Sequence, residues 1–574
     1  MYIAGWGKQE ILVKAQGYAM MGYGMWHNRA RGHDTPLYAR AFYLQDSQDH
    51  ALIFCCLDLG YITYAMRSAV VEILTLRLGQ SFDESSLVLT CTHTHSGPGG
   101  CSHDALYNVV TPGFVSDNLQ QIVNASVEAI LAAQQSAAPT DLELASGRFA
   151  NDVPVAWNRS LHAYNQNPDI VPQDKSNAHL ALDRTMPILS FRRDGELQSL
   201  LSFFGVHATC IGNTQEKYSG DNKGYASLAL EKELAKTGVK EPVAIFAQAT
   251  AGDVSPHYHG VGDSARRRNI KGAAEYVYAQ RNGQFQAEQA MAIVQQAAEE
   301  KITGRIESIL SYVDFSHQKA NPQYANGDDE AFTSEPCHGV AFFAGTPIDG
   351  PGMPSALAMA AKKIAQGIKK FRLKSLHKYS STEQDYYRRL YAAQGAKDIL
   401  LEDGPKRILG QAIDKLMIPA FADPLVGELK RQAAIGAINQ SALVPTVLPL
   451  QIIMIGQIAI VCCAGEFTTV AGQRVVQTVA EILKPRGIKR VLICTYCNDY
   501  MGYVTTREEY QQQAYEGGHT IFGQWTLAAF QTRFAHLAEE FCKPVAERAH
   551  DKITRPQPTP QDELALRSNL AIPK

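Results

Sequence analysis

Continuous apolar runs followed by polar or glycine-rich residues recur along this chain, and they predict buried β-strands. Four clear examples are Ala51–Leu57, Leu87–Cys91, Leu200–Val206 and Val243–Phe246. A longer apolar stretch, residues 448–465, is interrupted by Gly456-Gln457. We expect two buried strands that meet near a turn there, and no transmembrane segment. Runs without polar alternation are typical of strands that are covered on both faces.

Helical spacing of apolar residues separates several of these strands. Met66–Leu78 lies between the first two strands, which gives a β-α-β order. Further helices are expected at Val115–Gln135, Ala273–Glu300 and Phe522–Arg548. This alternation predicts an α/β fold with a layered, mixed β-sheet core flanked by helices.

The length of 574 residues would suit two to four ordinary domains, but no linker divides the chain. Because the candidate site residues described below come from distant segments and must converge, we expect one large domain over residues 1–550. It would contain a helical insertion at about 355–417. Residues 551–574 are rich in proline and polar residues and are expected to form a tail.

Composition narrows the class of protein. The chain has 54 Lys and Arg against 57 Asp and Glu, a net charge of −3, and 45% hydrophobic residues. These values exclude wholesale disorder and argue against a nucleic-acid partner. The eleven cysteines are interpreted as buried thiols of a reducing compartment. No secretory signal precedes the first strand, so a cytoplasmic location is expected unless a leader has been removed.

One segment is strongly basic, although the chain as a whole is nearly neutral. Ser355–Lys378 places seven basic residues among Ala, Leu, Ile and Phe, which predicts an amphipathic basic helix. A solvated helix face is the favoured interpretation, and a peripheral membrane contact stays open as the alternative. The basic residues are Lys362, Lys363, Lys369, Lys370, Arg372, Lys374 and Lys378.

The sequence leaves the oligomeric state undecided.

Histidine gathers in CTHTHSGPGGCSH, residues 91–103, directly after the strand Leu87–Cys91. His93 and His95 are two residues apart, so on an extended chain both side chains point to the same side. The glycines that follow allow an irregular loop and a close approach of backbone to a ligand. The segment therefore predicts a metal or catalytic site.

Other polar residues stand at the ends of further strands. His207 follows Leu200–Val206, Glu466 follows a strand in 448–465, and Ser255 lies in AGDVSP after Val243–Phe246. Two histidines and a carboxylate form a ligand set of catalytic zinc, which activates water. Ser255 remains open, either as a nucleophile or as a residue that contacts substrate.

Taken together, these segments resemble one family, the neutral ceramidases, which are zinc-dependent amide hydrolases. The resemblance covers residues 5 to about 548. Eight segments occur in the family's order: THTHSGPGG (92–100), NRSLHAYNQNP (158–168), GVHATCIGNT (205–214), SGDNKGYAS (219–227), AGDVSP (251–256), FAGTPIDGPG (343–352), GEFTTVAGQR (465–474) and GYVTTREEYQQQAYEGGHTIFG (502–523).

The resemblance implies a role for each matching residue. It makes His95 the acid/base histidine, and Arg159 and Tyr515 groups that contact the polar head of the substrate or a developing oxyanion. Ser255 matches a serine assigned to the catalytic site, whose role as nucleophile competes with a water that zinc activates. Tyr503 would not follow from spacing alone. The implied ligands of Zn²⁺ are His93, His207, Glu466 and Tyr503.

The implied activity is cleavage of the N-acyl bond of ceramide or a related N-acyl lipid into a fatty acid and an amine. Two alternatives remain open: a zinc hydrolase of a smaller soluble amide or ester, and a non-catalytic zinc-containing lipid-binding protein. Family members usually carry a C-terminal immunoglobulin-like domain, and the 574 residues leave no room for one after the last motif. We therefore expect the catalytic part alone.

Overall fold

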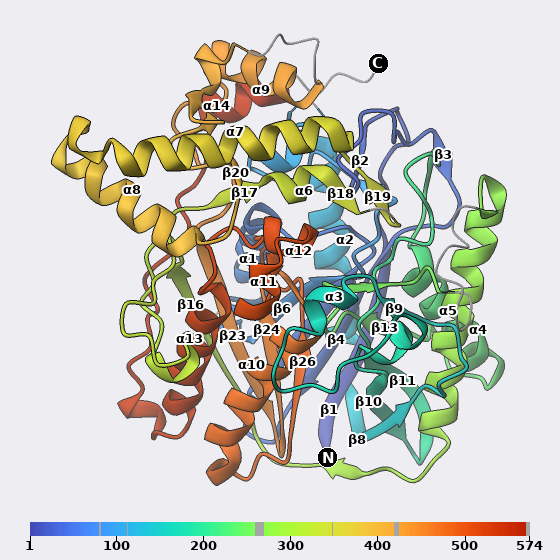
Figure 1. Cartoon of the computed structure of the whole chain (residues 1–574). Helices are drawn as coiled ribbons and strands as arrows, with labels where there is room; N and C mark the ends of the chain where they lie inside the picture. Colours follow the sequence, from blue (N-terminus) through green and yellow to red (C-terminus); the bar gives the residue numbers. More distant parts are fainter. Residues whose placement is uncertain (80–81, 112, 259–268, 347, 418–423, 570–574) are drawn as a thin grey trace.

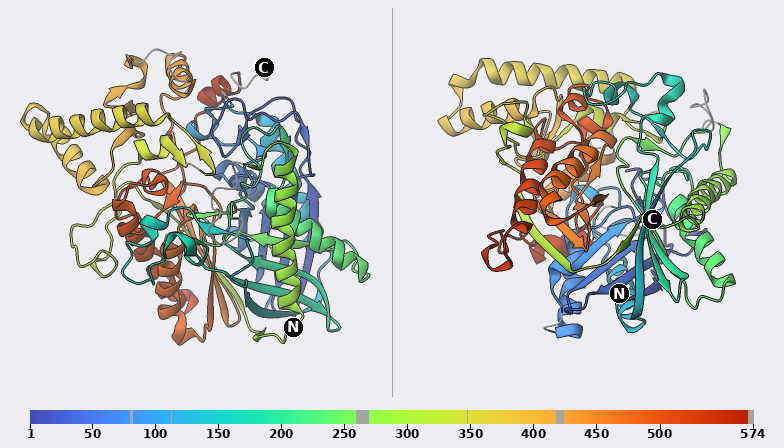
Figure 2. Two further views of the ribbon diagram at one scale, coloured as in Figure 1. Left: turned by 45° about the vertical axis from the view of Figure 1, so that its right-hand side comes forward. Right: turned by 90° about the horizontal axis from the view of Figure 1, so that it is seen from below.

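A computed structural model describes residues 1–79, 82–111, 113–258, 269–346, 348–417 and 424–569. Two β-sheets pack face to face at the centre of the molecule, and helices cover their outer faces (Figures 1 and 2). This arrangement confirms the predicted α/β class with a layered, mixed sheet core flanked by helices. The two sheets matter for function because residues at their strand ends build the candidate site.

The first sheet has nine strands in the order β13-β11-β10-β8-β1-β4-β5-β6, with β15 paired to β8. Most neighbours are antiparallel, but β5 and β6, and β11 and β13, run parallel. The strands are β1 (Tyr2–Glu10), β4 (Tyr38–Gln45), β5 (Ala51–Leu57), β6 (Leu87–Cys91), β8 (Ala138–Arg148), β10 (Thr185–Arg193), β11 (Glu196–Phe203), β13 (Ala244–Ala247) and β15 (Glu300–Ile302).

The second sheet has four strands in the order β16-β23-β24-β26. β23 and β24 form an antiparallel hairpin across Gly456-Gln457, as the interrupted apolar stretch predicts, and β26 lies parallel to β24. These strands are β16 (Ile306–Asp314), β23 (Val447–Ile455), β24 (Ile458–Cys463) and β26 (Arg490–Cys494).

Four groups of apolar residues explain the layers. One group joins the two sheets, with Phe54 of β5 and Ile460 of β24 among its members. Helices cover the outer face of the first sheet through two other groups, and helices cover the second sheet through a fourth. The covering helices are α1 (Tyr64–Leu78), α2 (Ser116–Gln135), α4 (Asp221–Lys236), α5 (Ala273–Val294), α10 (Thr469–Leu483) and α13 (Thr526–Phe541).

The strand β5 shows why continuous apolar runs occur here. Ile53 and Cys55 point to the side of α1 and α2, whereas Phe54 and Cys56 point to the second sheet. Because side chains alternate between faces and both faces are buried, every position is apolar. The helix α1 connects β5 to its parallel neighbour β6, which confirms the predicted β-α-β unit.

The cysteine and membrane predictions can also be compared with the structure. All eleven cysteines are free, and ten of them are buried. No helix among the described residues is long and apolar enough to cross a membrane.

Two helices stand out from the body of the molecule. In Figure 1 α7 (Ser355–Lys374) crosses the upper part of the view, and α8 (Ser381–Gln394) returns beneath its far end. The helical insertion expected at about 355–417 begins with these two helices, but its last part is not helical. Residues 399–412 form three short strands that extend from β17 (Cys337–Gly339), because their apolar side chains pack under the helices. The strands are β20 (Ile399–Glu402), β21 (Arg407–Ile408) and β22 (Gln411–Ala412).

The proline-rich tail contains a helix, α14 (Gln561–Ser568), that is fastened to the body. The buried Arg567 donates hydrogen bonds to the carbonyl oxygen of Ala437 and to the hydroxyl of Ser441. Residues 570–574 of the predicted tail lie outside the described residues.

Candidate metal centre

The loop after β6 brings His93 and His95 together, but by a route that differs from the prediction. His93 has a φ of 63°, in the left-handed region, so the chain turns there and is not extended. Their Nε2 atoms nevertheless lie 3.2 Å apart, with the two rings nearly perpendicular. A left-handed conformation at a non-glycine residue is uncommon and is often found at functional sites.

His207 follows β11, which lies near the other edge of the first sheet from β6, and it reaches the same point. Its backbone N–H donates to the carbonyl oxygen of Val254, and its ring Nδ1 lies 2.6 Å from the carbonyl oxygen of Ala251. The ring of His93 is held in the same manner, with Nδ1 2.5 Å from the carbonyl oxygen of Gly60. A proton on each Nδ1 leaves both Nε2 lone pairs free for a ligand.

Glu466 and Tyr503 are placed side by side by a very short parallel ladder. The strand β25 (Glu466–Phe467) pairs with β27 (Tyr503–Val504), and Glu466 is the direct partner of Tyr503. One strand follows β24 and the other follows β26, so both residues lie beyond the ends of the second sheet. Side chains of directly paired residues share a face of a sheet, so both can reach one centre.

The reactive atoms of these residues converge. The Oε2 atom of Glu466 lies 3.4 Å from Nε2 of His93 and 3.0 Å from Nε2 of His207. The hydroxyl of Tyr503 lies 3.1 Å from the same His207 nitrogen. Four ligands at about 2.0–2.2 Å from a tetrahedral zinc ion would be about 3.3–3.6 Å apart. The residues therefore fit a bound metal ion.

The charges around this point also suit a cation. Burial alone would raise the pKa of Glu466, but the neighbouring His93 and His207 outweigh it and hold that pKa well below its usual range. Burial lowers the pKa of His207, and Arg159 lowers it further. The centre thus offers a carboxylate and a neutral imidazole, the forms that bind metal. Tyr496 and Tyr500 donate hydrogen bonds to the two oxygens of Glu466 and orient it.

His95 differs from the other two histidines. Its Nδ1 is buried but has no hydrogen-bond partner among the described residues, so no carbonyl anchors its ring. The ring nitrogens of His93, His95 and His207 all lie within 4.8 Å of one another, close enough for His95 to be a ligand as well. Burial lowers the pKa of His95 well below its usual value, and the two neighbouring histidines add to this effect. An unanchored ring that is only partly buried suits proton transfer better than ligation.

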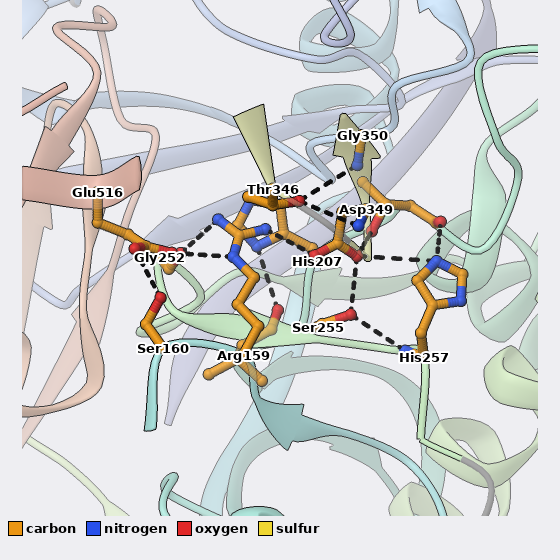
Figure 3. A network of polar contacts seen from close by, with 12 residues as sticks. Arg159, Ser160, His207, Gly252, Ser255, His257, Thr346, Asp349, Gly350 and Glu516 are labelled. Atoms are coloured by element: carbon orange, nitrogen blue, oxygen red, sulfur yellow. Dashed lines mark hydrogen bonds and ion pairs between the residues drawn. The ribbon is translucent and has the colours of Figure 1, made fainter. Parts of the chain in front are cut away.

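Arg159 connects the candidate metal centre to two acidic residues (Figure 3). It lies after β9 (Trp157–Asn158), which pairs with β14 (Val254–Ser255). Its guanidinium donates to Glu516 at 2.9 Å and to Asp349 at 3.1 Å. It also donates to the hydroxyl oxygen of Tyr503 at 3.0 Å and to a backbone carbonyl. A cationic donor on a phenol oxygen favours the phenolate form that a metal would bind.

Ser255 is fully buried in this network. Its Oγ donates to Oδ1 of Asp349 at 2.7 Å and accepts from the backbone N–H of His257. Figure 3 shows Asp349 between Ser255 and Arg159, on the hairpin of β18 (Gly345–Thr346) and β19 (Gly350–Pro351). No hydrogen bond joins Ser255 to a histidine ring among the described residues, so the arrangement of a serine nucleophile with a histidine base is absent there.

Tyr515 lies at the start of α12 (Tyr515–Gly518), beside Tyr503 and Arg159. Its ring meets the ring of Tyr503 edge to face, with centroids 5.4 Å apart, and Arg159 lies 5.5 Å from its centroid. Phe342, on α6 (Val340–Ala344), packs against the other side of this ring at 5.5 Å. Tyr515 and Phe342 are both partly exposed, so their paired rings form part of the molecular surface.

All eight residues singled out in the sequence thus lie in one connected region. His103, the third histidine of the sequence cluster, is not part of the group, and its ring packs on Phe114. Sequence reasoning did not select Asp349 and Glu516, which hold Arg159. The signal was present, because both lie inside segments that matched the family, but a single carboxylate before a glycine has no distinctive spacing.

Comparison with known proteins agrees with this picture. Residues 2–413 and 430–532 match the sequence family described as neutral/alkaline non-lysosomal ceramidase, N-terminal. A neutral ceramidase of Pseudomonas aeruginosa is 33% identical over 540 residues, which cover 94% of this chain and 72% of the relative. A neutral ceramidase of Mycobacterium tuberculosis is 29% identical and covers 97% of this chain and 79% of that protein.

Solved structures show the same likeness. One is described as a ceramidase complexed with C2, and it superposes with a TM-score of 0.78 at 30% identity. That match covers 97% of this chain and 77% of the other. The crystal structure of neutral ceramidase from Pseudomonas aeruginosa gives a TM-score of 0.74, also at 30% identity, over 94% and 74% of the two chains.

Proposed function

Because this chain belongs to the family of neutral/alkaline non-lysosomal ceramidases, which are amide hydrolases, we propose that it is a zinc-dependent enzyme that cleaves the N-acyl bond of ceramide. The observation that carries the proposal is the convergence of four metal-binding side chains next to an unanchored histidine and a partly exposed tyrosine. The products would be a fatty acid and sphingosine.

Four residues would hold the zinc ion: His93, His207, Glu466 and Tyr503. Their mutual distances and the anchored tautomers of the two histidines support this choice over other groups in the region. When bound, zinc would lower the pKa of a water molecule and polarise the amide carbonyl. Burial and Glu466 raise the pKa of Tyr503 well above its usual value, and the hydrogen bond from Arg159 works against this rise and would help a bound metal to hold the oxygen as phenolate.

The remaining residues would handle the proton and the carbonyl oxygen. His95 would take a proton from the attacking water and pass it to the leaving amine, since its Nδ1 has no hydrogen-bond partner among the described residues and burial favours the neutral ring by lowering its pKa. Tyr515 would donate its hydroxyl hydrogen to the carbonyl oxygen as negative charge develops there, and burial keeps this phenol protonated by raising its pKa. These two roles need a substrate between the two side chains.

Ser255 and Arg159 would act by position. The hydroxyl of Ser255 is committed to Asp349, and the guanidinium of Arg159 already makes four hydrogen bonds within the protein. These hydrogen bonds support a positioning role for both residues. Ser255 and Arg159 would hold Asp349, Tyr503 and the substrate in place. A water nucleophile is favoured over Ser255, because the hydroxyl of this serine donates to Asp349 and no histidine ring accepts its hydrogen among the described residues.

The test is zinc content measured together with release of fatty acid from long-chain ceramide. We expect one zinc ion per chain in the wild type and its loss in Glu466→Gln. His95→Ala should retain zinc and lose activity by about 10²- to 10⁴-fold, the usual contribution of general acid–base catalysis. His103→Ala serves as the matched control and should keep both zinc and activity, because its ring packs outside the cluster.

Two results would contradict the proposal. Full activity of His95→Ala would remove its acid/base role, and unchanged zinc in Glu466→Gln would remove the ligand set. Comparison of long-chain ceramide with short soluble amides and esters tests the substrate. Faster turnover of the small substrates by the wild type would establish the alternative hydrolase instead.

A further inference from the structure

The pair of helices α7 and α8 concentrates positive charge. Residues 355–394 contain nine Lys and Arg against two Asp and Glu, a net charge of +7 in a chain whose net charge is −3. The helix α7 itself has no acidic residue. Figure 1 and both views of Figure 2 show these helices as an arm that projects from the body. Such a charge asymmetry points to an anionic partner.

Apolar side chains lie beside this charge on α7. Leu357, Ile364 and Phe371 are 57%, 51% and 59% exposed, and their seven-residue spacing places them along one side of the helix. Lys363 and Lys370 immediately precede the last two, about 100° round the helix axis. An apolar stripe next to a row of lysines is typical of helices that lie in a membrane interface.

The lysines of this row are available to a partner. Within the described part of the chain, the ammonium groups of Lys363, Lys370 and Lys374 are exposed, and no carboxylate lies within 4 Å of them. Lys362, by contrast, lies 3.6 Å from Asp398, and Lys369 donates to the carbonyl oxygen of Gly395. The first three therefore make no ion pair that binding would have to break.

The face of α7 opposite the lysines, which adjoins the apolar stripe, packs on the rest of the protein. Arg372 is buried and donates to the hydroxyl of Tyr391 on α8 and to Glu402 on β20. Ala361 and Ala365 are buried on the same side. Because this face already packs on the protein, the exposed apolar stripe is not needed for folding of the arm.

The arm begins next to the candidate metal centre. The hairpin that carries Asp349 ends at Pro351, and α7 starts at Ser355. Backbone hydrogen bonds from Gly352 and Met353 tie the start of α7 to α6, the helix whose Phe342 packs against Tyr515. A surface in contact with α7 would therefore lie close to the place where substrate is bound.

We propose that α7 docks the enzyme on an anionic phospholipid membrane, with Leu357, Ile364 and Phe371 entering the interface and Lys363, Lys370 and Lys374 contacting the headgroups. This inference rests on the proposed function, since a lipid amide is presented by such a surface. The apolar stripe favours a membrane over a nucleic acid, which would use the lysines alone.

Flotation with vesicles tests the docking without any catalysis. The wild-type protein should bind vesicles of phosphatidylcholine with phosphatidylglycerol more tightly than vesicles of phosphatidylcholine alone. The triple variant K363E/K370E/K374E should bind the anionic vesicles at least about tenfold more weakly. The pair I364S/F371S should also weaken binding, and the remaining charge-dependent binding should fall as salt is raised.

A matched triple variant, K232E/K236E/K240E, makes the same charge change on and after α4, away from the arm, and should bind like the wild type. Equal loss in this control, or no preference of the wild type for anionic vesicles, would overturn the proposal. So would I364S/F371S abolishing a dimer in size-exclusion chromatography without affecting vesicle binding. If K363E/K370E/K374E lost vesicle binding while I364S/F371S bound like the wild type, the helix would contact the membrane through charge alone. That result would refute insertion of the apolar stripe.

Activity separates this inference from the proposed function. The arm variants should hydrolyse a short-chain, water-soluble ceramide at the wild-type rate but ceramide in anionic vesicles at least about tenfold more slowly. If the wild type hydrolyses neither substrate yet still binds vesicles through α7, the proposed function fails and the docking surface stands. If it hydrolyses both and the arm variants are unaffected, the docking surface fails alone.

Discussion

At the scale of single residues, three identical side chains differ in how their Nδ1 nitrogen is held. His93 and His207 each direct Nδ1 to a backbone carbonyl, whereas Nδ1 of His95 has no such partner among the described residues. An anchored ring keeps one nitrogen aimed at a fixed point, as a metal ligand requires. An unanchored ring can turn between two partners, as proton transfer requires.

Asp349 was not selected from the sequence, yet it accepts hydrogen bonds from both Arg159 and Ser255. We predict that Asp349→Asn lowers kcat/KM for a soluble ceramide by about 10- to 100-fold, because a charged hydrogen bond to Arg159 is lost and an amide N–H must face either that cation or Ser255. Zinc content and the thermal unfolding midpoint should change little. Steady-state kinetics and metal analysis check both statements.

The matched control for Asp349 is Asp385→Asn on α8, where an exposed carboxylate forms only a surface ion pair with Arg389. This variant should behave like the wild type. If Asp349→Asn retained wild-type kcat/KM, the network in Figure 3 would have no catalytic consequence.

At the scale of elements, short and irregular pieces of chain place the site residues, while long elements support them. The ladders β25–β27 and β14–β9 contain two residue pairs each, yet they align Glu466 with Tyr503 and bring Arg159 next to Ser255. Such short strands carry too few residues to show a two-residue periodicity in sequence. The long strands around them were predicted because each is a continuous apolar run.

The contact between β1 and α2 depends on glycine. A Cβ atom at Gly7 would lie 2.6 Å from the backbone nitrogen of Ala133, so the helix could not pack as closely. We predict that Gly7→Val destabilises the protein by about 1–3 kcal/mol, the usual effect of overpacking, with a matching fall in the denaturant midpoint. Chemical unfolding followed by circular dichroism measures it.

Gly367 offers the opposite case as a control. It lies in α7 with no atom within 4 Å of a Cβ built on it, so Gly367→Ala should stabilise α7 by up to about 1 kcal/mol. Equal stability of Gly7→Val and the wild type would mean that α2 can move outward without loss of packing.

At the scale of the whole molecule, the candidate centre is a joint between the two sheets. His93 and His207 follow strands of the first sheet, and Glu466 and Tyr503 follow strands of the second. Arg67 adds a second joint, since its guanidinium on α1 donates to Tyr312 of β16 and to Asn498.

The cytoplasmic location and the single-domain organisation remain predictions.

A metal held from both sheets should stabilise the folded molecule as a whole. We predict that a chelator lowers the thermal unfolding midpoint of the wild type, since a ligand at a thousand times its Kd contributes about 4 kcal/mol. The midpoint of Glu466→Gln should not respond to chelator. Differential scanning calorimetry before and after chelation, with zinc added back, decides the question, and an unaffected wild type would contradict it.

By itself the sequence determined the class of fold. Apolar runs without alternation identified strands buried on both faces, and helical spacing identified α1, α2 and α5, because burial and periodicity are local properties of the chain. The histidine motif and the polar residues at strand ends identified His93, His95, His207 and Glu466. The family resemblance added Tyr503, Arg159 and Tyr515.

Only the tertiary structure decided how these residues act together. The left-handed turn at His93, the pairing of Glu466 with Tyr503, and the clamp of Asp349 and Glu516 on Arg159 join segments up to several hundred residues apart. Local pattern cannot encode such distances, because they are set by how two sheets pack and where their strands end. For the same reason, only the folded chain shows that the basic helix α7 stands beside the site.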